Sequence, residues 1–185
     1  MGSQKDMRAA WLNRDRKVDT RLKPTCWVLD LGCTRSMGSR KAIEAFIKAG
    51  RQLGIKCTWK PTKTVMTFAN GETATLQWMV EIEFPTNPPV RTTVDCHEGG
   101  DIPILMSMRQ MCSLEFVLET KLVNTMTPHV ILTSKVLGID RQVLNLSTTD
   151  HVVIDLAMIK GRVKLANNAT TFSATTQGGT WANMK

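Results

Sequence analysis

The sequence predicts a mostly β fold with one or two helices, and three observations support this. The segment 65–84 contains the turn dipeptide Asn70-Gly71, and its second half, 76–84, alternates apolar and polar residues. Short apolar runs bounded by glycine, proline or polar residues recur along the chain, which is typical of strands. One segment, which follows Ser39, instead has its apolar residues at helical spacing.

Composition limits the classes of protein that remain. The chain has 185 residues, of which 42% are hydrophobic, enough for one domain with extensions. It has no apolar run of 18 or more residues, so we expect no membrane span. Residues 1–10 carry charges without an apolar core, unlike a signal peptide. The five cysteines lack CxxC spacing, which favours reduced thiols in the cytoplasm over a disulfide framework or zinc site.

The first predicted elements are a strand and a helix. Residues 25–31 form a short apolar run that predicts a buried strand. Ser39 is a favourable N-cap for the helix that follows, and Gly50 and Gly54 weaken and then end it. The inward face of this helix is predicted to comprise Ile43, Phe46, Ile47 and Leu53.

A hairpin comes next, after a short strand predicted over residues 57–60. Asn70-Gly71 favours a two-residue type I′ turn, which requires positive φ at both positions. The second arm alternates with a period of two, which predicts one buried face. That face is expected to comprise Leu76, Trp78, Val80, Ile82 and Phe84.

The middle of the chain predicts a turn at 85–89 and a strand at 90–96, followed by the polar loop 97–101. The adjacent His97 and Glu98 are too few for a metal-ligand set, and we therefore predict no metal site. Asp101 is interpreted as a turn residue.

The segment 102–118 is predicted to form a strand, a short helix and a second strand. The predicted elements are the strand Ile104–Met106, the helix from Ser107 through Leu114, with Met111 facing inward, and the strand Phe116–Leu118. The proposed organisation is a flexible basic lead (1–24), a core domain (25–120), an extension with one or two strands (121–160) and a disordered tail or linker (161–185). The extension's apolar runs are 130–132 and 152–156; the second contains Asp155 without a following glycine.

The stretch Cys26–Met37 is the candidate site. Its apolar run leads directly into Asp30, and Gly32 follows two positions later. A carboxylate at the end of a buried strand must be paired or hydrogen-bonded, and it is a candidate for acid–base chemistry. The alternative is that Asp30 merely caps a turn. Cys33 as a nucleophile would need a partnered histidine, and the three histidines are distant in sequence.

The segment Trp27-Val-Leu-Asp-Leu-Gly-Cys-Thr-Arg-Ser-Met37 resembles the active-site strand of retropepsins, the aspartic proteases of retroviruses and retrotransposons. It is most similar to the Copia-type retrotransposon pattern. Phe68-Ala-Asn-Gly71 resembles an element that precedes the family's second long strand, and the strand–Ser107–helix–strand order also fits. The resemblance covers residues 25–120.

The resemblance implies a small closed barrel in which Asp30 is the catalytic carboxylate. The active-site loop would comprise Leu31, Gly32, Cys33 and Thr34, and the flap or substrate-binding residues would be Phe68, Ala69, Asn70 and Gly71. The family supplies one aspartate per chain, which implies a homodimer that cleaves an extended polyprotein peptide without metal or cofactor. The resemblance also implies an intracellular location, with virus-like particles as one possibility. For the tip of the hairpin, an ordinary surface turn remains the alternative.

Two departures from the family pattern bear on activity. The family has Thr or Ser where this chain has Leu31, whose side chain cannot make the hydroxyl bonds that stiffen the family's dimeric site. The family commonly has glycine and then arginine where this chain has Ser107 and Met108, with Arg109 one position later. The second hypothesis is therefore a retropepsin-like dimerisation or peptide-binding module without catalysis.

The basic lead suggests a third hypothesis. The net charge is +8, and residues 1–24 hold seven Lys or Arg against three Asp, which gives +4. Such a segment could contact RNA phosphates. The alternative is a solvated linker left by a polyprotein.

Overall fold

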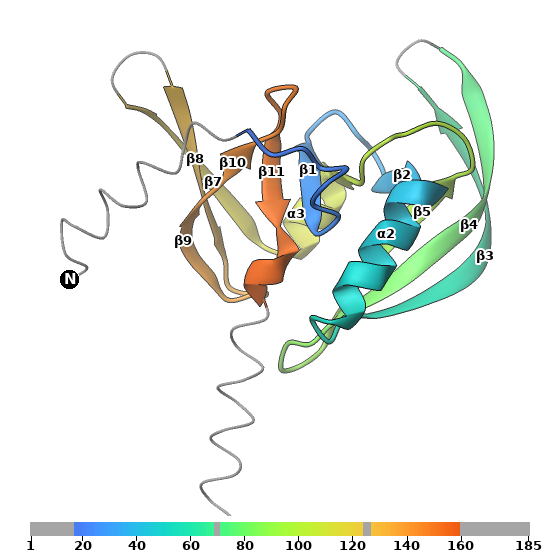
Figure 1. Cartoon of the computed structure of the whole chain (residues 1–185), viewed down its shortest axis with the longest axis horizontal. Coiled ribbons are helices and arrows are strands. Elements are labelled where there is room, and N and C mark those ends of the chain that lie inside the picture. The colour runs from blue at the N-terminus through green and yellow to red at the C-terminus, as the bar shows by residue number, and fades with distance from the viewer. Residues whose placement is uncertain (1–16, 69–70, 124–126, 160–185) are drawn as a thin grey trace, which may run out of the picture.

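The computed structural model describes residues 17–68, 71–123 and 127–159. The described residues contain eleven strands and two α-helices (Figure 1), which confirms the predicted mostly β fold. The elements are β1 (Cys26–Asp30), β2 (Met37–Ser39), α2 (Arg40–Arg51), β3 (Lys56–Thr67), β4 (Thr73–Phe84), β5 (Val90–His97), β6 (Leu105–Ser107), α3 (Met108–Ser113), β7 (Phe116–Val123), β8 (Thr127–Ser134), β9 (Ile139–Val143), β10 (Asn145–Leu146), β11 (Val152–Asp155) and the short 3-10 helix η1 (Leu156–Ile159).

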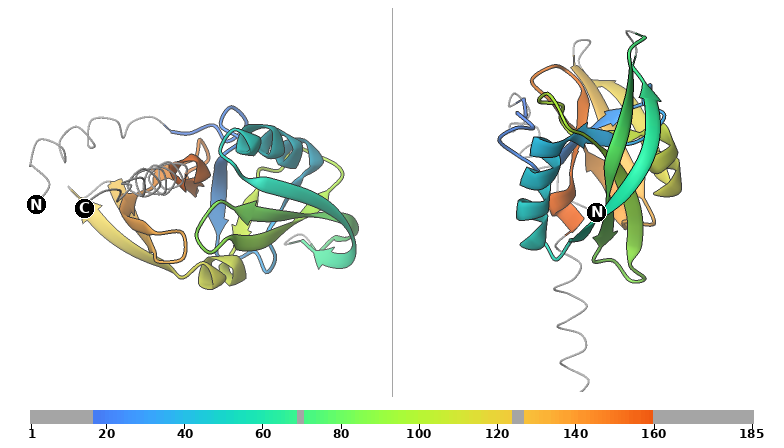
Figure 2. Two further views of the ribbon diagram at one scale, coloured as in Figure 1. Left: turned by 90° about the horizontal axis from the view of Figure 1, so that it is seen from below. Right: turned by 90° about the vertical axis from the view of Figure 1, so that its right-hand side faces the viewer.

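The strands form two sheets. The larger has eight strands in the order β10-β11-β1-β6-β2-β5-β4-β3, and the smaller has the order β7-β8-β9. Figure 2 shows the small sheet on one side of β1 and the β3–β4 hairpin on the other. Within the described residues the larger sheet is open, with β10 and β3 at its ends, and no closed barrel is found.

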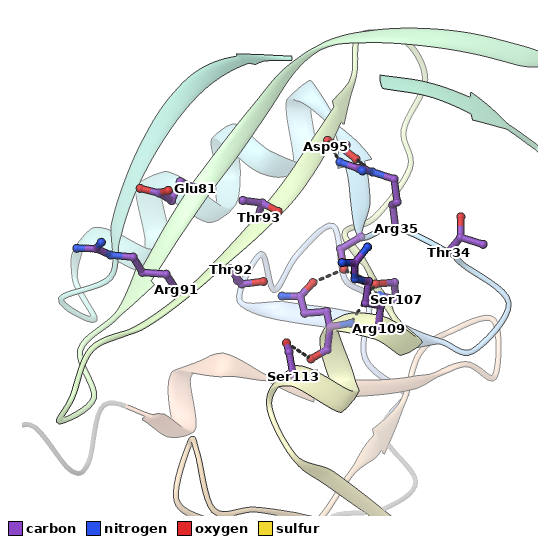
Figure 3. A pocket seen from close by; sticks show the side chains of 12 residues that line it. Thr34, Arg35, Glu81, Arg91, Thr92, Thr93, Asp95, Ser107, Arg109 and Ser113 are labelled. Atoms are coloured by element: carbon purple, nitrogen blue, oxygen red, sulfur yellow. Dashed lines mark hydrogen bonds and ion pairs between the residues drawn. The ribbon is translucent and has the colours of Figure 1, made fainter. Parts of the chain in front are cut away.

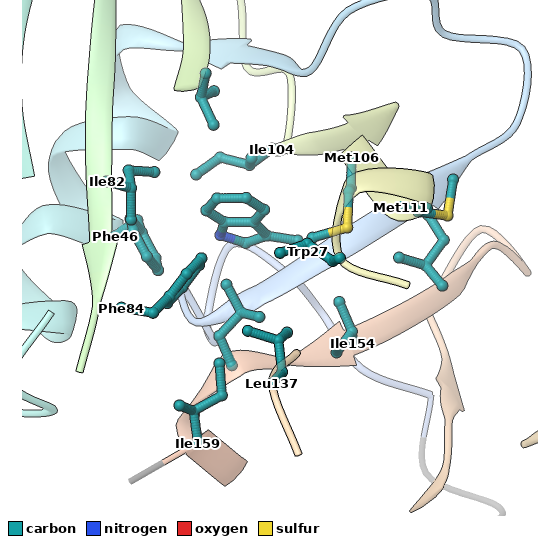
Figure 4. Packing of buried hydrophobic residues seen from close by; sticks show 14 of the residues in the cluster. Trp27, Phe46, Ile82, Phe84, Ile104, Met106, Met111, Leu137, Ile154 and Ile159 are labelled. Atoms are coloured by element: carbon teal, nitrogen blue, oxygen red, sulfur yellow. The ribbon is translucent and has the colours of Figure 1, made fainter. Parts of the chain in front are cut away.

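The main core surrounds the strand that ends in Asp30. Trp27 of β1 packs edge-to-face against Phe46 of α2, with ring centroids 4.9 Å apart (Figure 4). Ile82 of β4 and Ile154 of β11 belong to the same buried cluster. Strands from the first and last thirds of the described chain therefore contribute to one core, which fixes the position of β1.

Helix α2 begins as predicted. The Ser39 hydroxyl accepts a hydrogen bond from the Ala42 N–H at 3.3 Å, which satisfies one of the free donors in the first turn. Ile43 and Phe46 are almost fully buried, as the apolar stripe requires. The chain leaves the helix through Gly54, whose φ of +76° lies in the left-handed region that favours glycine.

The first arm of the hairpin differs from the prediction. The prediction of a separate strand over 57–60 is wrong, because β3 continues to Thr67. The register of β3 with β4 is irregular between Pro61 and Thr64. Proline supplies no backbone N–H, which is tolerable here because β3 lies at an edge of the sheet. The polar stretch around Pro61 concealed this continuity in the sequence.

The tip of the hairpin closes differently from a type I′ turn. The Phe68 N–H donates to the Glu72 carbonyl at 2.8 Å, and the Gly71 N–H donates to the Phe68 carbonyl at 2.9 Å. Three residues therefore lie between Phe68 and Glu72, which close the hairpin, whereas a hairpin with a two-residue type I′ turn has two residues between its closing pair. Gly71 has φ of +83°, whereas Ala69 and Asn70 lie outside the described residues.

The predicted alternation along β4 is largely confirmed. The buried members of the predicted face are Leu76, Val80, Ile82 and Phe84. Trp78 is the exception, because 39% of its surface remains exposed. It lies where β4 pairs with Pro61 of the irregular edge strand, so the sheet offers it less cover.

The strand–helix–strand prediction for 102–118 is confirmed. The Ser107 hydroxyl accepts a hydrogen bond from the Gln110 N–H at 3.3 Å and so caps α3. Met111 and Leu114 are buried in the main core, as expected. The following strand, β7, begins at Phe116 and is longer than the predicted segment.

The region beyond residue 121 holds more strands than the one or two expected. Both predicted runs lie in strands, β8 and β11, but β9 and β10 are also present. The sequence of β9, Ile139–Val143, carries too few apolar residues to predict a strand. β11 pairs antiparallel with β1, placing Ile154 opposite Trp27, and so extends the chain's own sheet.

Part of the expected flexible lead packs against the fold. Val18 is buried, its N–H donates to the Leu146 carbonyl at 2.8 Å, and its carbonyl accepts from the Thr148 N–H at 3.1 Å. Lys17 also pairs with Asp150 at 2.8 Å. Residues 1–16 of the lead and the tail expected over 161–185 lie outside the described residues.

Two further predictions concern thiols and membrane spans. All five cysteines are free thiols. None of the helices in the described segments is long and apolar enough to cross a membrane.

Candidate active site

Asp30 is the last residue of β1, and its side chain is half-buried. Its Oδ1 atom accepts a hydrogen bond from the backbone N–H of Gly32 at 2.9 Å. A Cβ atom at position 32 would lie 3.4 Å from that oxygen, which is an ordinary van der Waals contact. The Asp-x-Gly spacing places the Gly32 N–H within hydrogen-bond distance of the Asp30 carboxylate.

The end of β1 lies beside the end of β6. The two strands are parallel, and Asp30 is in register with Ser107. The chain leaves the two strands at the same edge of the sheet, into the loop at Leu31 and into α3 at Met108. Asp30 is thus held between a buried strand and the start of a capped helix.

The residues that follow Asp30 and Ser107 in the sequence are both apolar and exposed. Leu31 has 63% of its surface exposed, and Met108 has 49%. Large apolar side chains exposed together beside a polar site are typical of surfaces that bind another protein. Complete burial of one such side chain stabilises an interface by about 1.5–3 kcal/mol. The edge that carries Asp30 therefore presents two large apolar side chains to solvent.

The loop after Gly32 is held by local hydrogen bonds. The Cys33 N–H donates to the Asp30 carbonyl at 3.3 Å, and its thiol donates to the Arg35 carbonyl at 2.6 Å. Desolvation raises the pKa of the Cys33 thiol, and the neighbouring Asp30 and Asp95 carboxylates raise it further. A nucleophilic cysteine needs a lowered pKa, so this environment argues against the cysteine alternative. Thr34 is exposed at the outer end of the loop.

The hairpin and the Asp30 loop share a small apolar cluster. Its buried members are Met37, Met66 and Leu76, and both Phe68 and Cys33 pack against it. Phe68 also makes an edge-to-face contact with His97, with centroids 5.6 Å apart. The structure therefore joins the base of the hairpin to the loop that carries the candidate aspartate.

The other acidic residues considered in the sequence have different partners. Asp101 lies 3.4 Å from Lys41 in an ion pair. Asp155 accepts hydrogen bonds from the Thr25 hydroxyl at 2.7 Å and from the Ala157 N–H at 2.9 Å, which caps η1. Both carboxylates are therefore engaged with other partners, and neither is hydrogen-bonded to Asp30.

His97 and Glu98 do not converge on a common point. The His97 Nδ1 atom bonds to the Gly99 carbonyl at 2.7 Å, whereas Glu98 accepts two bonds from Arg40, each 2.6 Å long. In the part of the chain that the structure describes, no group of three or more His, Cys, Asp or Glu side chains could hold a metal ion.

A buried polar network beneath the loop escaped the sequence reasoning. The Ser36 hydroxyl accepts from the Ser107 N–H at 2.9 Å and also bonds to the Gln110 side chain. Asp95 is 2% exposed and accepts from the Arg35 Nε at 2.5 Å. The available signal was a carboxylate between Val94 and Cys96 in β5, because buried carboxylates need partners.

The chain matches no protein-family model, no curated protein and no solved structure.

Proposed function

We propose that this chain is an aspartic endopeptidase of the retropepsin type, which cleaves a retroelement polyprotein as a homodimer. The observation that carries the proposal is the setting of Asp30. Its carboxylate is held at the end of a buried strand by the Gly32 N–H, next to the exposed Leu31 and Met108. A single carboxylate at an apolar edge is what each half of a symmetric two-chain site would contribute.

The proposed chemistry uses one Asp30 from each chain. Two carboxylates about 3 Å apart share one proton, because both cannot be ionised at that distance. The ionised group removes a proton from a water molecule, which attacks the peptide carbonyl, and the protonated group donates to the carbonyl oxygen. The resulting tetrahedral intermediate collapses as one carboxylic acid protonates the leaving nitrogen and the C–N bond breaks, while the other carboxylate recovers a proton from the intermediate's hydroxyl group. The apparent pKa values belong to the pair, so activity is expected at mildly acidic pH.

The β3–β4 hairpin is the proposed cover over the substrate. Phe68 and Cys33 pack on the same cluster, so a movement of the hairpin is mechanically connected to the Asp30 loop. An extended peptide would lie between them as an added strand, with backbone hydrogen bonds supplying affinity and side-chain pockets supplying specificity.

The remaining parts of the proposal concern the fold, the location and contact with RNA. The retropepsin-like fold, here with an open sheet in place of the expected closed barrel, rests on the β1–β6–β2 arrangement followed by α3. An intracellular location, including virus-like particles, rests on the polyprotein substrate. RNA contact through residues 1–24 rests on their excess positive charge.

A second candidate is a retropepsin-like module that dimerises or binds peptides without catalysis. The exposed Leu31 favours it, because an apolar side chain there adds contact area but supplies no hydroxyl to brace two active-site loops. If replacing Leu31 with Thr creates cleavage that the parent lacks, this second candidate is favoured.

The first test measures cleavage of a mixed peptide library near pH ~5, where an aspartate pair holds one proton. The parent chain is compared with Asp30→Asn, and with Asp101→Asn as a matched control on an exposed loop. The proposal expects cleavage by the parent and the control, and none by Asp30→Asn. Equal cleavage by all three chains would show that Asp30 is not catalytic.

A further inference from the structure

Strand β5 lies inside the larger sheet, but its first half has a neighbouring strand on one side only. β4 pairs with it from Val90 to Cys96 in an uninterrupted register. β2, on its other side, pairs only with Asp95 and the two residues that follow. The edge of β5 over residues 90–94 therefore has no strand beside it in the part of the chain that the structure describes.

The backbone groups of this edge point away from β4. The Asp95 N–H donates to the Ser36 carbonyl at 2.9 Å, so the backbone groups of Asp95 face the β2 side. Backbone groups along a strand face its two sides alternately, with a period of two residues. Arg91 and Thr93 therefore direct their N–H and C=O groups to the same side as Asp95, beyond the end of β2. These groups can form a ladder with one more strand.

A cavity of about 430 Å³ borders this edge (Figure 3). Thr92 and Thr93 both line it, although consecutive residues of a strand point to opposite faces of a sheet. The cavity therefore follows the edge of β5 rather than one of its faces. Its opposite wall includes Ser107 and Arg109, which Figure 3 shows across the cavity from β5. A strand added to β5 would run about 4.8 Å from it, on the side of this cavity.

This edge lacks the features that protect the outer edge of the same sheet. There, β3 contains Pro61 and an irregular register, and Lys56 and Lys63 are exposed. Proline, bulges and lysine are common means of preventing an added strand. Residues 90–94 contain no proline or lysine and keep a regular register, and four of the five are valine or threonine, which favour strands. The β5 edge is therefore suited to accept a strand.

The charges that line the cavity favour an acidic segment. Its two carboxylates are already paired: Glu81 lies 2.7 Å from Lys60. Asp95 lies 2.5 Å from Arg35. Arg109 is exposed on the opposite wall and has no ion-pair partner within the described residues. A guanidinium group binds a carboxylate through two parallel N–H donors, so an aspartate or glutamate on an added strand suits this position.

We propose that the free edge of β5 binds an extended, acidic segment of another protein, which joins the sheet as a strand beside residues 91–94. The segment forms backbone hydrogen bonds with Arg91 and Thr93, and one of its carboxylates pairs with Arg109. Backbone bonds supply affinity in this mode of recognition, and side-chain contacts supply specificity. The site is distinct from the proposed catalytic site, because Asp30 is not among the residues that line the cavity.

The test is fluorescence anisotropy with a short labelled peptide in which valine and glutamate alternate. Two matched peptides carry lysine in place of glutamate, or N-methyl groups on every backbone amide, which remove its hydrogen-bond donors. Thr93→Pro removes an N–H that points to the cavity but none that faces β4, and proline is tolerated at such an edge. Arg109→Ala removes the unpaired charge, and Arg51→Ala, an exposed arginine outside the cavity, is its control. Thermal unfolding checks that each variant is folded.

The proposal expects saturable binding of the glutamate peptide at one site per chain. Binding should be at least about tenfold weaker for the lysine and N-methylated peptides and in Thr93→Pro, and weaker in Arg109→Ala. It should be unchanged in Arg51→Ala and Asp30→Asn. Absence of saturable binding, or equal binding of the N-methylated peptide, would overturn the proposal without reference to any variant. Equal binding of the lysine peptide would exclude an acidic partner, and weaker binding by Asp30→Asn would assign the peptide to the proposed catalytic site.

Amide hydrogen exchange followed by nuclear magnetic resonance locates the bound peptide. In the free chain, the Thr93 N–H should exchange faster than the N–H of Val94, which faces β4. A saturating amount of the glutamate peptide should slow exchange at Thr93. Unchanged exchange there would place the peptide elsewhere and overturn the proposal.

Discussion

Replacing Ile154 with alanine tests whether the C-terminal strand belongs to the chain's own core. Ile154 is fully buried opposite Trp27 in the β1–β11 pair. The replacement removes three carbons, worth about 2.4 kcal/mol of transfer free energy at ~0.8 kcal/mol each. A cavity of roughly 75 Å³ that does not collapse adds about 1.8 kcal/mol. The free energy of unfolding should therefore fall by about 2.5–4 kcal/mol.

Thermal unfolding followed by circular dichroism measures this change. For a chain of this size, about 2–4 °C of Tm is lost per kcal/mol, so we expect a decrease of roughly 5–16 °C. Val117→Ala, at a position 57% exposed on β7, is the control and should change stability by less than about 0.5 kcal/mol. The Tm difference should be the same at low and high protein concentration, because β11 pairs within one chain. A loss equal to that of the control, or one that depends on concentration, would refute this reasoning.

Three further predictions concern single residues. Ser36→Ala should lower the free energy of unfolding by about 1–3 kcal/mol in urea titrations, because the buried Ser107 N–H loses its acceptor; an unchanged midpoint would contradict this. Burial raises the pKa of the Cys26 thiol from 9.0 to about 12, so the folded state should lose stability as pH rises from 9.0 towards 12. In native alkylation at pH ~8, the exposed Cys112 should react and Cys26 should not, as mass spectrometry would show; equal labelling would show that β1 opens. Gly71→Ala should destabilise the chain by about 1–2 kcal/mol in thermal melts, because φ is +83°; a neutral result would contradict that conformation.

Local signals in the sequence predicted the elements that hold the candidate site. Ser39 caps α2 and Ser107 caps α3 because hydroxyl side chains satisfy free N–H groups wherever a helix begins. The alternation along β4 predicted its buried face because strand side chains have a period of two. Even there, the predicted burial of Trp78 was wrong, since its exposure depends on the irregular strand beside it.

Long-range partners could not be predicted from the sequence. The buried Asp95 binds Arg35, which lies 60 residues earlier, and no local pattern connects them. β9 is held in place by its pairing with β8. Because it has few apolar residues, its own sequence gives little sign of a strand. The position of Asp30 beside Ser107 likewise depends on the parallel pairing of β1 and β6.

A mixing experiment tests the central proposal, the shared aspartate pair, most directly. Peptide cleavage by a fixed amount of the parent chain is measured alone and after exchange with an equal amount of Asp30→Asn. If two chains form each site, random pairing leaves only about half as many parent–parent dimers, so activity should fall to about half. Unchanged activity would mean that each chain cleaves independently, and it would contradict a site built from one Asp30 of each chain.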